Sequence, residues 1–282
     1  MTMAKLQVIG GGKMGEALVG GLIDAGWAAP AELRVVEKLR ARADELQAIF
    51  PEVTVSDAST EADGHLLAVK PGDVETVCAT LPSGRVLSIA AGVTIDRLEA
   101  ALPDGTAVVR AMPNTGALVG AGAAAIASGH AANEDDLAWA ESILAAVGTV
   151  VRVDESLLDA VTGLSGSGPA YVFLVVEAMV EAGVLAGLPR PVSTALAHQT
   201  VLGAAKLLAE TGQSPAELRA AVTSPGGTTA AGLRELERSG VRAAFLDAVK
   251  AATDRSRELG LLSYPVGEAD AAQGGRAGSG GG

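Results

Sequence analysis

Short runs of apolar residues alternate with longer amphipathic stretches through the first half of the chain. The runs are apolar at consecutive positions, which is typical of strands that helices cover on both faces. They predict strands at Leu6–Ile9, Leu33–Glu37, Val53–Val55, His65–Val69, Arg85–Ile89, Ala107–Arg110 and Ala123–Ala127. The stretches between them predict helices at Gly15–Ala25, Arg40–Ile49, Asp73–Thr80 and Thr94–Ala101. This alternation predicts an α/β fold with a parallel, doubly wound sheet.

The pattern changes close to Val153. From Asp154 to Gly260 no segment has the pattern of a convincing strand, and long stretches rich in Ala, Leu and Val predict an all-α region. Ser214 with Glu217 forms a capping box, which marks one helix start. We therefore predict a sheet domain over 1–153, a helical domain over 154–270 and a disordered tail over 271–282, where apolar periodicity is absent.

The segment Gly168–Ala186 is apolar on nearly every side of its predicted helix. A helix of this kind must be buried all round. Because the helical domain is small, we expect a second copy of the chain to cover this helix in an obligate dimer. Burial of the helix within its own domain is the alternative.

Composition narrows the class of protein. Hydrophobic residues make up 49% of the 282 residues, which excludes global disorder, and aromatic residues only 2%, so the core must be aliphatic. The net charge of −12 argues against a nucleic-acid partner. Cys78 is the single cysteine, which excludes an intrachain disulfide, and we expect it to be a buried apolar residue. The three histidines lie far apart in sequence, so we expect no metal site.

The chain start, MTMAKLQVIGGG, lacks the basic region, hydrophobic stretch and cleavage site of a signal peptide. The most membrane-like stretch is Ala170–Val180, which Glu177 interrupts and Glu181 follows. It is too short and too charged to span a bilayer. We therefore expect a soluble, cytoplasmic protein.

A G-x-G-x-x-G pattern follows the first predicted strand and opens a helix. Its residues are Gly10, Gly11, Gly12, Lys13, Met14 and Gly15. Gly10 permits a tight turn, Gly12 lets the backbone approach a pyrophosphate, and Gly15 lets the helix pack against the strand. The helix N-terminus then faces the anion. This context predicts a dinucleotide cofactor.

The second predicted strand ends at Glu37, where dinucleotide-binding folds hold the adenosine ribose. A carboxylate there favours NAD because it would repel a 2′-phosphate. Lys38, Arg40 and Arg42 follow at once and could neutralise such a phosphate. The sequence leaves the choice between NADH and NADPH open.

Two further strand ends should contact the cofactor, because ligands of open α/β sheets gather at the carboxyl ends of the strands. The fourth predicted strand ends in Ala68, Val69, Lys70 and Pro71, where Lys70 can contact the cofactor or a carboxylate. The fifth ends in Ala90 and Ala91, and small residues there leave room for a nicotinamide ring.

Three more motifs make the pattern specific. Ala111–Asn114 follows a strand, Thr162–Tyr171 opens the long apolar helix, and Val222–Thr229 precedes another helix. With Gly10–Gly15 and Ala68–Pro71, in this order and spacing, they closely resemble pyrroline-5-carboxylate reductases over nearly the whole chain. The resemblance implies an N-terminal Rossmann-type dinucleotide-binding domain, an all-α dimerisation domain, and active sites built from both chains of a homodimer. Family members often assemble further, into a decamer of five dimers.

The resemblance also implies the reaction. A hydride passes from NAD(P)H to the C=N bond of 1-pyrroline-5-carboxylate and forms L-proline, the last step of proline biosynthesis. We expect NADPH as the cofactor, with NADH as the alternative. A protonated imine is already electrophilic, so catalysis can rest on orientation and water exclusion.

The family positions carry over onto particular residues. The resemblance places Ser224, Gly227, Thr228, Thr229 and Glu155 at the substrate. The Gly-rich loop and the helix N-terminus after it could hold a carboxylate through backbone N–H groups. For Glu155, a first-turn glutamate that balances the helix dipole is an equal alternative. Thr162 matches the catalytic position whose hydroxyl can reach the ring nitrogen, although an N-cap or helix-packing threonine is an equal alternative.

Other proteins share parts of this pattern. β-Hydroxyacid dehydrogenases have the same two-domain plan but need a catalytic lysine in the long helix, and Ala170–Ala186 contains none. Deazaflavin-dependent NADP reductases are shorter. A regulatory nicotinamide-binding module has no reason to keep the substrate motifs. A hydrolase elbow at Gly163–Ser167 would need glycine at position 167 and a preceding strand.

Overall fold

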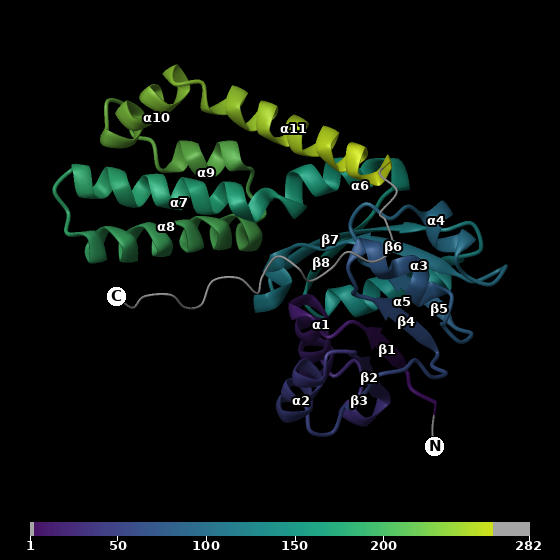
Figure 1. The fold of residues 1–282 in the computed structure, drawn as a ribbon. Coiled ribbons are helices and arrows are strands. Elements are labelled where there is room, and N and C mark those ends of the chain that lie inside the picture. Colours follow the sequence, from purple (N-terminus) through teal and green to yellow (C-terminus); the bar gives the residue numbers. More distant parts are fainter. Residues whose placement is uncertain (1–2, 262–282) are drawn as a thin grey trace, which may run out of the picture. The chain divides into compact units, whose positions relative to one another are not determined.

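The computed structural model describes residues 3–261. The predicted disordered tail, 271–282, therefore lies outside the described residues. The chain divides into two compact units: one runs through Gly166 and resumes at Thr253, and the other comprises Ser167–Ala252. Each unit is described by itself below, with the element labels of Figure 1.

The first unit is built on one sheet of eight strands in the order β3-β2-β1-β4-β5-β6-β7-β8. The strands are β1 (Leu6–Ile9), β2 (Leu33–Val36), β3 (Thr54–Ser56), β4 (Gly64–Leu67), β5 (Arg85–Ser88), β6 (Val108–Met112), β7 (Gly122–Ser128) and β8 (Gly148–Arg152). From β3 across to β6 all neighbours are parallel. The chain steps outward from β1 to β2 and β3, and then returns to β4 on the other side of β1. This reversal creates the crevice in which doubly wound sheets bind their ligands.

The sequence predicted a parallel sheet, and this prediction is wrong for one pair of strands. Strand β7 runs antiparallel to β6, with Met112 opposite Ala125, and β8 then pairs parallel with β7. Two adjacent parallel strands need a crossover of a dozen or more residues. The connection 113–121 is too short for that, and it holds only the short helical turn η3 (Thr115–Val119).

Two elements were missed by the sequence prediction, namely the edge strand β8 and the helix α5 (Glu134–Ala145) before it. In β8 no position is fully buried, so the strand lacks a continuous buried run. Helix α5 begins with a capping box in which Asn133 accepts hydrogen bonds from the N–H groups of Asp135 and Asp136. That local signal is visible in the sequence.

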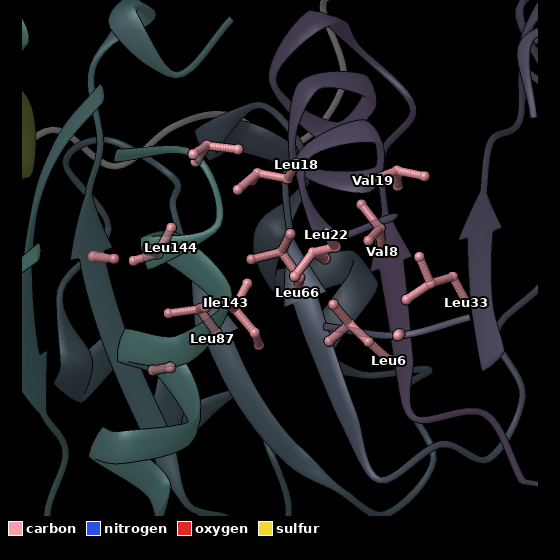
Figure 2. Packing of buried hydrophobic residues seen from close by; sticks show 14 of the residues in the cluster. Leu6, Val8, Leu18, Val19, Leu22, Leu33, Leu66, Leu87, Ile143 and Leu144 are labelled. Carbon is pink, nitrogen blue, oxygen red and sulfur yellow. The ribbon is translucent and has the colours of Figure 1, made fainter. Parts of the chain in front are cut away.

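Helices cover both faces of the sheet and create two cores. They are α1 (Lys13–Asp24), α2 (Arg40–Ile49), α3 (Val74–Cys78), α4 (Ile95–Ala100), α5 and α6 (Leu158–Val161). On one face, Leu6, Val8 and Leu66 pack with Leu18 and Leu22 of α1 and with Ile143 of α5, as Figure 2 shows. On the other face, Ile9 and Leu67 pack with α3 and α4. Alternate residues of one strand thus serve different cores, which is why the strands are apolar throughout.

The first unit extends beyond the last strand because α6 packs on the sheet. Leu158 of α6 lies in a small apolar cluster with Ile95, Ala125 and Ala127. At the other end of the chain, the hydroxyl of Ser256 donates a hydrogen bond of 2.6 Å to Asp159. The last strand therefore ends at Arg152, whereas the first stretch of this compact unit continues to Gly166.

The second unit contains only helices among its described residues. They are α7 (Gly168–Leu185), α8 (Arg190–Thr211), α9 (Pro215–Ala221), α10 (Thr228–Arg238) and α11 (Val241–Leu261), of which the part of α11 from Thr253 belongs to the first unit. The predicted capping box at Ser214 and Glu217 is confirmed. Helices α7 and α8 approach closely where Gly183 faces Ser193, whose hydroxyl donates to the Val180 carbonyl at 2.8 Å.

Helix α7 is not buried by its own chain, so burial within its own domain is contradicted. Val180 is the single buried residue of the helix. Phe173 and Leu174 are 64% and 66% exposed. The helical run Glu155–Leu185 is also long and apolar enough to cross a membrane by length and composition alone. The sequence argument that this region is too short to span a bilayer is therefore wrong, because the helix is longer than Ala170–Val180.

Candidate functional site

The phosphate loop between β1 and α1 is built from glycines, and at three of four positions a Cβ would overlap a neighbouring atom. Gly10 has a φ of +104°, and a Cβ there would lie 2.6 Å from the Ala68 carbonyl oxygen. A Cβ on Gly11 would overlap the Leu46 side chain, and one on Gly15 would overlap the Gly10 carbonyl oxygen. At Gly12, by contrast, a Cβ would meet nothing within 4 Å. Gly12 therefore borders open space, as a position that a pyrophosphate approaches should.

A cleft of about 430 Å³ opens beside this loop. It brings together seven of the predicted cofactor residues, namely Gly10, Gly12, Glu37, Lys38, Ala68, Val69 and Lys70. Ile9, Val36, Leu39, Asp73, Thr76 and Val77 complete its lining. The last three follow β4, in η2 (Pro71–Asp73) and α3, and the sequence analysis missed them as site residues. The cleft lies where the strand order reverses, between β1 and its neighbours.

The remaining predicted cofactor residues do not line this cleft. Gly11, Lys13 and Met14 belong to the loop and the first turn of α1, and Pro71 begins η2. Ala90 and Ala91 follow β5, the strand next to β4. Ala90 is buried and Ala91 is exposed. They lie at the carboxyl edge of the sheet but one strand further along than the cleft.

Glu37 is held rigidly by the backbone around it. One carboxylate oxygen accepts a hydrogen bond of 3.0 Å from the Gly11 N–H, and the other accepts one of 2.8 Å from the Leu39 N–H. The carboxylate thereby links the end of β2 to the phosphate loop. Its negative charge is fixed in the cleft, at the position that contacts the ribose in Rossmann folds.

The three basic residues after Glu37 have different surroundings. The Arg42 guanidinium donates to the Gly11 carbonyl oxygen at 2.7 Å and pairs with Glu16 and Glu45. The hydrogen bond to Glu16 is the main cause that raises the pKa of Arg42. Arg42 therefore supports the loop and has its donors engaged. Lys38 lines the cleft, whereas the exposed Arg40 pairs with Asp44 at 3.1 Å and does not line the cleft.

Thr162 lies at the start of a π-helical turn, Thr162–Gly166, between α6 and α7. Such turns inside helices occur frequently at functional sites. The Thr162 hydroxyl donates a hydrogen bond of 2.9 Å to the Leu158 carbonyl oxygen. With its proton directed there, the oxygen presents a lone pair to any further partner.

Asn114 ties this π turn to the sheet. Its side-chain amide donates to the Ser165 carbonyl oxygen at 3.1 Å. Its side-chain oxygen accepts from the N–H groups of Gly116 and Ala123, both at 3.1 Å. The motif at Ala111–Asn114, which the sequence singled out without a role, thus holds the segment that carries Thr162.

Glu155 forms an ion pair that the sequence did not reveal. One carboxylate oxygen accepts from Arg110 at 2.7 Å and from the backbone N–H of Ile95 at 2.7 Å. Arg110 lies in β6 and is only 8% exposed. The carboxylate therefore joins β6, the start of α4 and the turn η4 (Glu155–Leu157).

The predicted substrate loop lies in the second unit, between α9 and α10. Gly226 has a φ of +69°, and a Cβ on Gly227 would overlap the Ser224 hydroxyl. Gly227 is the N-cap of α10 and has no side chain to cap the helix. The first N–H groups of the helix, on Thr228 and Thr229, are therefore available to an anion. Ser224 is exposed and Thr229 half-buried.

The fold also gathers residues that the sequence left apart. Asp96, Glu99 and His130 have carboxylate and imidazole atoms within 4.8 Å of one another, beside a cavity of about 200 Å³. Glu99 accepts from both the backbone N–H and the Nδ1 of His130, at 2.7 Å each, and the bond to the ring raises the pKa of His130. Cys78 is buried as expected, and burial raises the pKa of its thiol to about 11, so the thiol is neutral.

Two family models match the chain. Residues 155–259 match the model for pyrroline-5-carboxylate reductase dimerisation. Residues 5–92 match that for NADP oxidoreductases dependent on coenzyme F420. The second match covers the part of the sheet that forms the phosphate loop and the cleft, and it does not extend into the helical region.

Whole-chain relatives agree with the first model. A pyrroline-5-carboxylate reductase from Synechocystis sp. is 50% identical over 91% of this chain and 98% of its own length. One from Mycobacterium tuberculosis is 46% identical over 91% and 97%. Among solved structures, a pyrroline-5-carboxylate reductase from Coxiella burnetii has a TM-score of 0.84 at 37% identity, over 92% of this chain and 99% of its own. A Plasmodium falciparum pyrroline carboxylate reductase with NADP bound has a TM-score of 0.78 at 30% identity, over 92% and 100%.

The doubly wound sheet, its glycine loop and the cleft at its point of reversal define an NAD(P)H-dependent oxidoreductase with an added helical dimerisation region. This class is the one that the sequence motifs indicated. The chain belongs to the pyrroline-5-carboxylate reductase family.

Proposed function

We propose that this protein reduces 1-pyrroline-5-carboxylate to L-proline with NADPH as the expected hydride donor and NADH as the alternative. The observation that carries the proposal is the 50% identity over nearly the full length of a pyrroline-5-carboxylate reductase. The roles of individual site residues are part of this proposal, and the geometry of the site supports them.

The cleft fits a dinucleotide. Open space at Gly12 and the N-terminus of α1 suit the pyrophosphate, and the fixed Glu37 carboxylate suits the ribose hydroxyls. Lys38 lies beside it for a 2′-phosphate. We propose that Ala90 and Ala91 leave room for the nicotinamide. When bound, the reduced nicotinamide supplies the hydride.

The residues of the chain then bind and orient the imine. The N–H groups of Thr228 and Thr229 at the positive end of α10 are proposed to hold the substrate carboxylate, with the Ser224 hydroxyl beside them. Thr162 is proposed as the catalytic residue at the ring nitrogen. Because its own proton is directed to the Leu158 carbonyl oxygen, its hydroxyl oxygen would accept a hydrogen bond from the protonated imine rather than donate one.

We infer that the helical unit pairs with a second copy of the chain. The exposed apolar side chains of α7 offer a surface for a partner, and the match to a dimerisation model favours a second protein chain there. The family resemblance extends this to active sites shared between two chains, and to a ring of five dimers. We propose a dinucleotide-binding role for 1–153, a dimerisation and substrate role for 154–270, and a cytoplasmic location without membrane or nucleic-acid partners.

A direct assay tests the function. Purified protein is mixed with racemic pyrroline-5-carboxylate and either NADPH or NADH, and the absorbance of the reduced nicotinamide is followed. Oxidation together with newly formed proline supports the proposal, and the ratio of the two rates gives the preferred donor. Absence of oxidation with either donor, in protein shown to bind them, would refute it and point to another imine or ketone.

A further inference from the structure

Arg110 is absent from the site that the sequence motifs outlined, and the proposed reaction assigns it no role. We propose that Arg110 is a positioning residue: it fixes Glu155 so that one carboxylate oxygen stays free for the substrate. This inference rests on the proposed function, since it concerns the substrate of that reaction.

The two oxygens of Glu155 differ in their surroundings. Oε1 accepts both recorded hydrogen bonds, from Arg110 Nη1 and from the Ile95 N–H, each 2.7 Å long. Within the described residues, Oε2 has no hydrogen-bond partner. The Glu155 side chain is 29% exposed, so its carboxylate is neither buried in the core nor fully solvated. Two donors on one oxygen set the plane of the carboxylate and leave the other oxygen as an oriented acceptor.

Stability alone does not explain the ion pair. The Arg110 side chain is 10% exposed, and withdrawing a guanidinium this far from water costs much of what the pair returns. We infer that this pair is kept for the geometry that it imposes. Here the pair fixes the conformation of a residue that the family resemblance places at the substrate.

The location of Arg110 supports the same reading. Arg110 holds the beginning of the segment that leads to Thr162, at Glu155, while Asn114 holds its end, at Ser165. Arg110 lies in the middle of β6, and Asn114 lies two residues after the end of this strand. A ring nitrogen that must stay aligned during hydride transfer needs acceptors that do not move.

Steady-state kinetics of Arg110→Met and Arg110→Lys test this role, with the dissociation constant of NADPH measured by fluorescence titration. We expect Arg110→Met to raise KM for pyrroline-5-carboxylate by about tenfold or more, the usual effect of losing a charged hydrogen bond. The NADPH dissociation constant should stay within about twofold, because Arg110 does not line the cleft. Arg110→Lys keeps one charged donor, so its KM for pyrroline-5-carboxylate should lie between those of the wild type and Arg110→Met.

A matched control is Arg85→Met. Arg85 is also partly buried and paired, with Asp63 at 2.5 Å, but it lies at the amino end of β5 and does not contact Glu155. Its loss should lower the melting temperature without changing KM. A double variant sharpens the test: if Arg110 acts through Glu155, adding Arg110→Met to Glu155→Gln should change KM no further.

The outcomes separate the possibilities. If Arg110→Met keeps the wild-type KM and kcat, or if its effect adds fully to that of Glu155→Gln, the positioning role is wrong. Should Arg110→Met fail to fold, Arg110→Lys alone and combined with Glu155→Gln gives the same two comparisons. A wild-type protein that does not reduce pyrroline-5-carboxylate would instead refute the proposed function.

Discussion

Single residues of the phosphate loop differ in the substitutions they tolerate. Gly10, Gly11 and Gly15 are each closed in by neighbouring atoms, whereas Gly12 has ordinary extended backbone and borders open space. We therefore expect Gly12→Val to fold normally and to lose at least about 100-fold in NADPH affinity, because the new side chain takes the place of the pyrophosphate. Fluorescence titration with NADPH measures this, with a melting curve to verify folding.

Gly20→Ala in the same helix serves as the control. A Cβ at Gly20 would make an ordinary contact of 3.7 Å with Phe50, so cofactor affinity should not change. Wild-type affinity in Gly12→Val would show that the loop does not bind the pyrophosphate.

The choice between NADPH and NADH should depend on Glu37. Its carboxylate is fixed by two backbone N–H groups, so its charge cannot turn away from an incoming 2′-phosphate. In Glu37→Gln we expect the ratio of kcat/KM for NADPH to that for NADH to rise about tenfold, because a repulsive charge is removed.

Glu45→Gln is the matched change, since it removes a carboxylate beside the same loop, one that pairs with Arg42 and does not line the cleft. It should leave the cofactor ratio unaltered. An unaltered ratio in Glu37→Gln as well would assign specificity to Lys38 and Arg40 instead.

The sequence predicted these loop residues because the motif is local: its glycines and Glu37 follow from strand ends and spacing. It could not predict the pairing of Arg110 with Glu155, which are 45 positions apart. Nothing in the neighbourhood of either residue signals the other. Similarly, Thr76 and Val77 reach the cleft only because α3 packs against the strand before it.

Among the elements, those with a continuous apolar run or a clear helical period were predicted well. Strand β1 and helix α2 have the predicted bounds, and the capping box of α9 is present. The direction of β7 was missed because strand direction depends on the length of the connection rather than on the strand itself. Strand β8 was missed because an edge strand is not buried on both faces.

The element that carries Thr162 yields another prediction. Asn114 makes three hydrogen bonds that hold the π turn and the loop after β6. In Asn114→Ala these backbone groups lose their partners, and we expect a loss of roughly 2–3 kcal/mol in unfolding free energy. Because the turn also loosens, kcat should fall about tenfold. Urea unfolding and steady-state assays measure the two effects.

Asn133→Ala provides the comparison. It removes the cap of α5, which should cost about 1 kcal/mol and leave kcat unchanged. If Asn114→Ala loses stability but keeps its kcat, the turn is a structural feature without a catalytic consequence.

At the scale of the whole molecule, the exposed apolar face of α7 is the surface that the proposed dimer would bury. Phe173 and Leu174 present large apolar side chains that water disfavours. We expect light scattering to give the wild-type protein at least twice the subunit mass of 28.0 kDa. Leu174→Glu should shift it toward the monomer, because two charges would enter the interface of each dimer.

Ile49→Glu is the control for a charge added at an exposed apolar position, since Ile49 is 50% exposed on α2. It should not alter the mass. A wild-type monomer at micromolar concentration would contradict the dimer, and a wild type that requires detergent would point to a lipid partner for α7.

The central claim is that this chain transfers a hydride from the nicotinamide to the imine carbon of 1-pyrroline-5-carboxylate. The most direct test supplies NADPH with deuterium at the transferable position of C4 and analyses the product by mass spectrometry. We expect proline that is heavier by one deuterium, at C5 of the ring, and Gly12→Val should form it far more slowly at the same NADPH concentration. Proline without deuterium, or oxidised cofactor without proline, would contradict it.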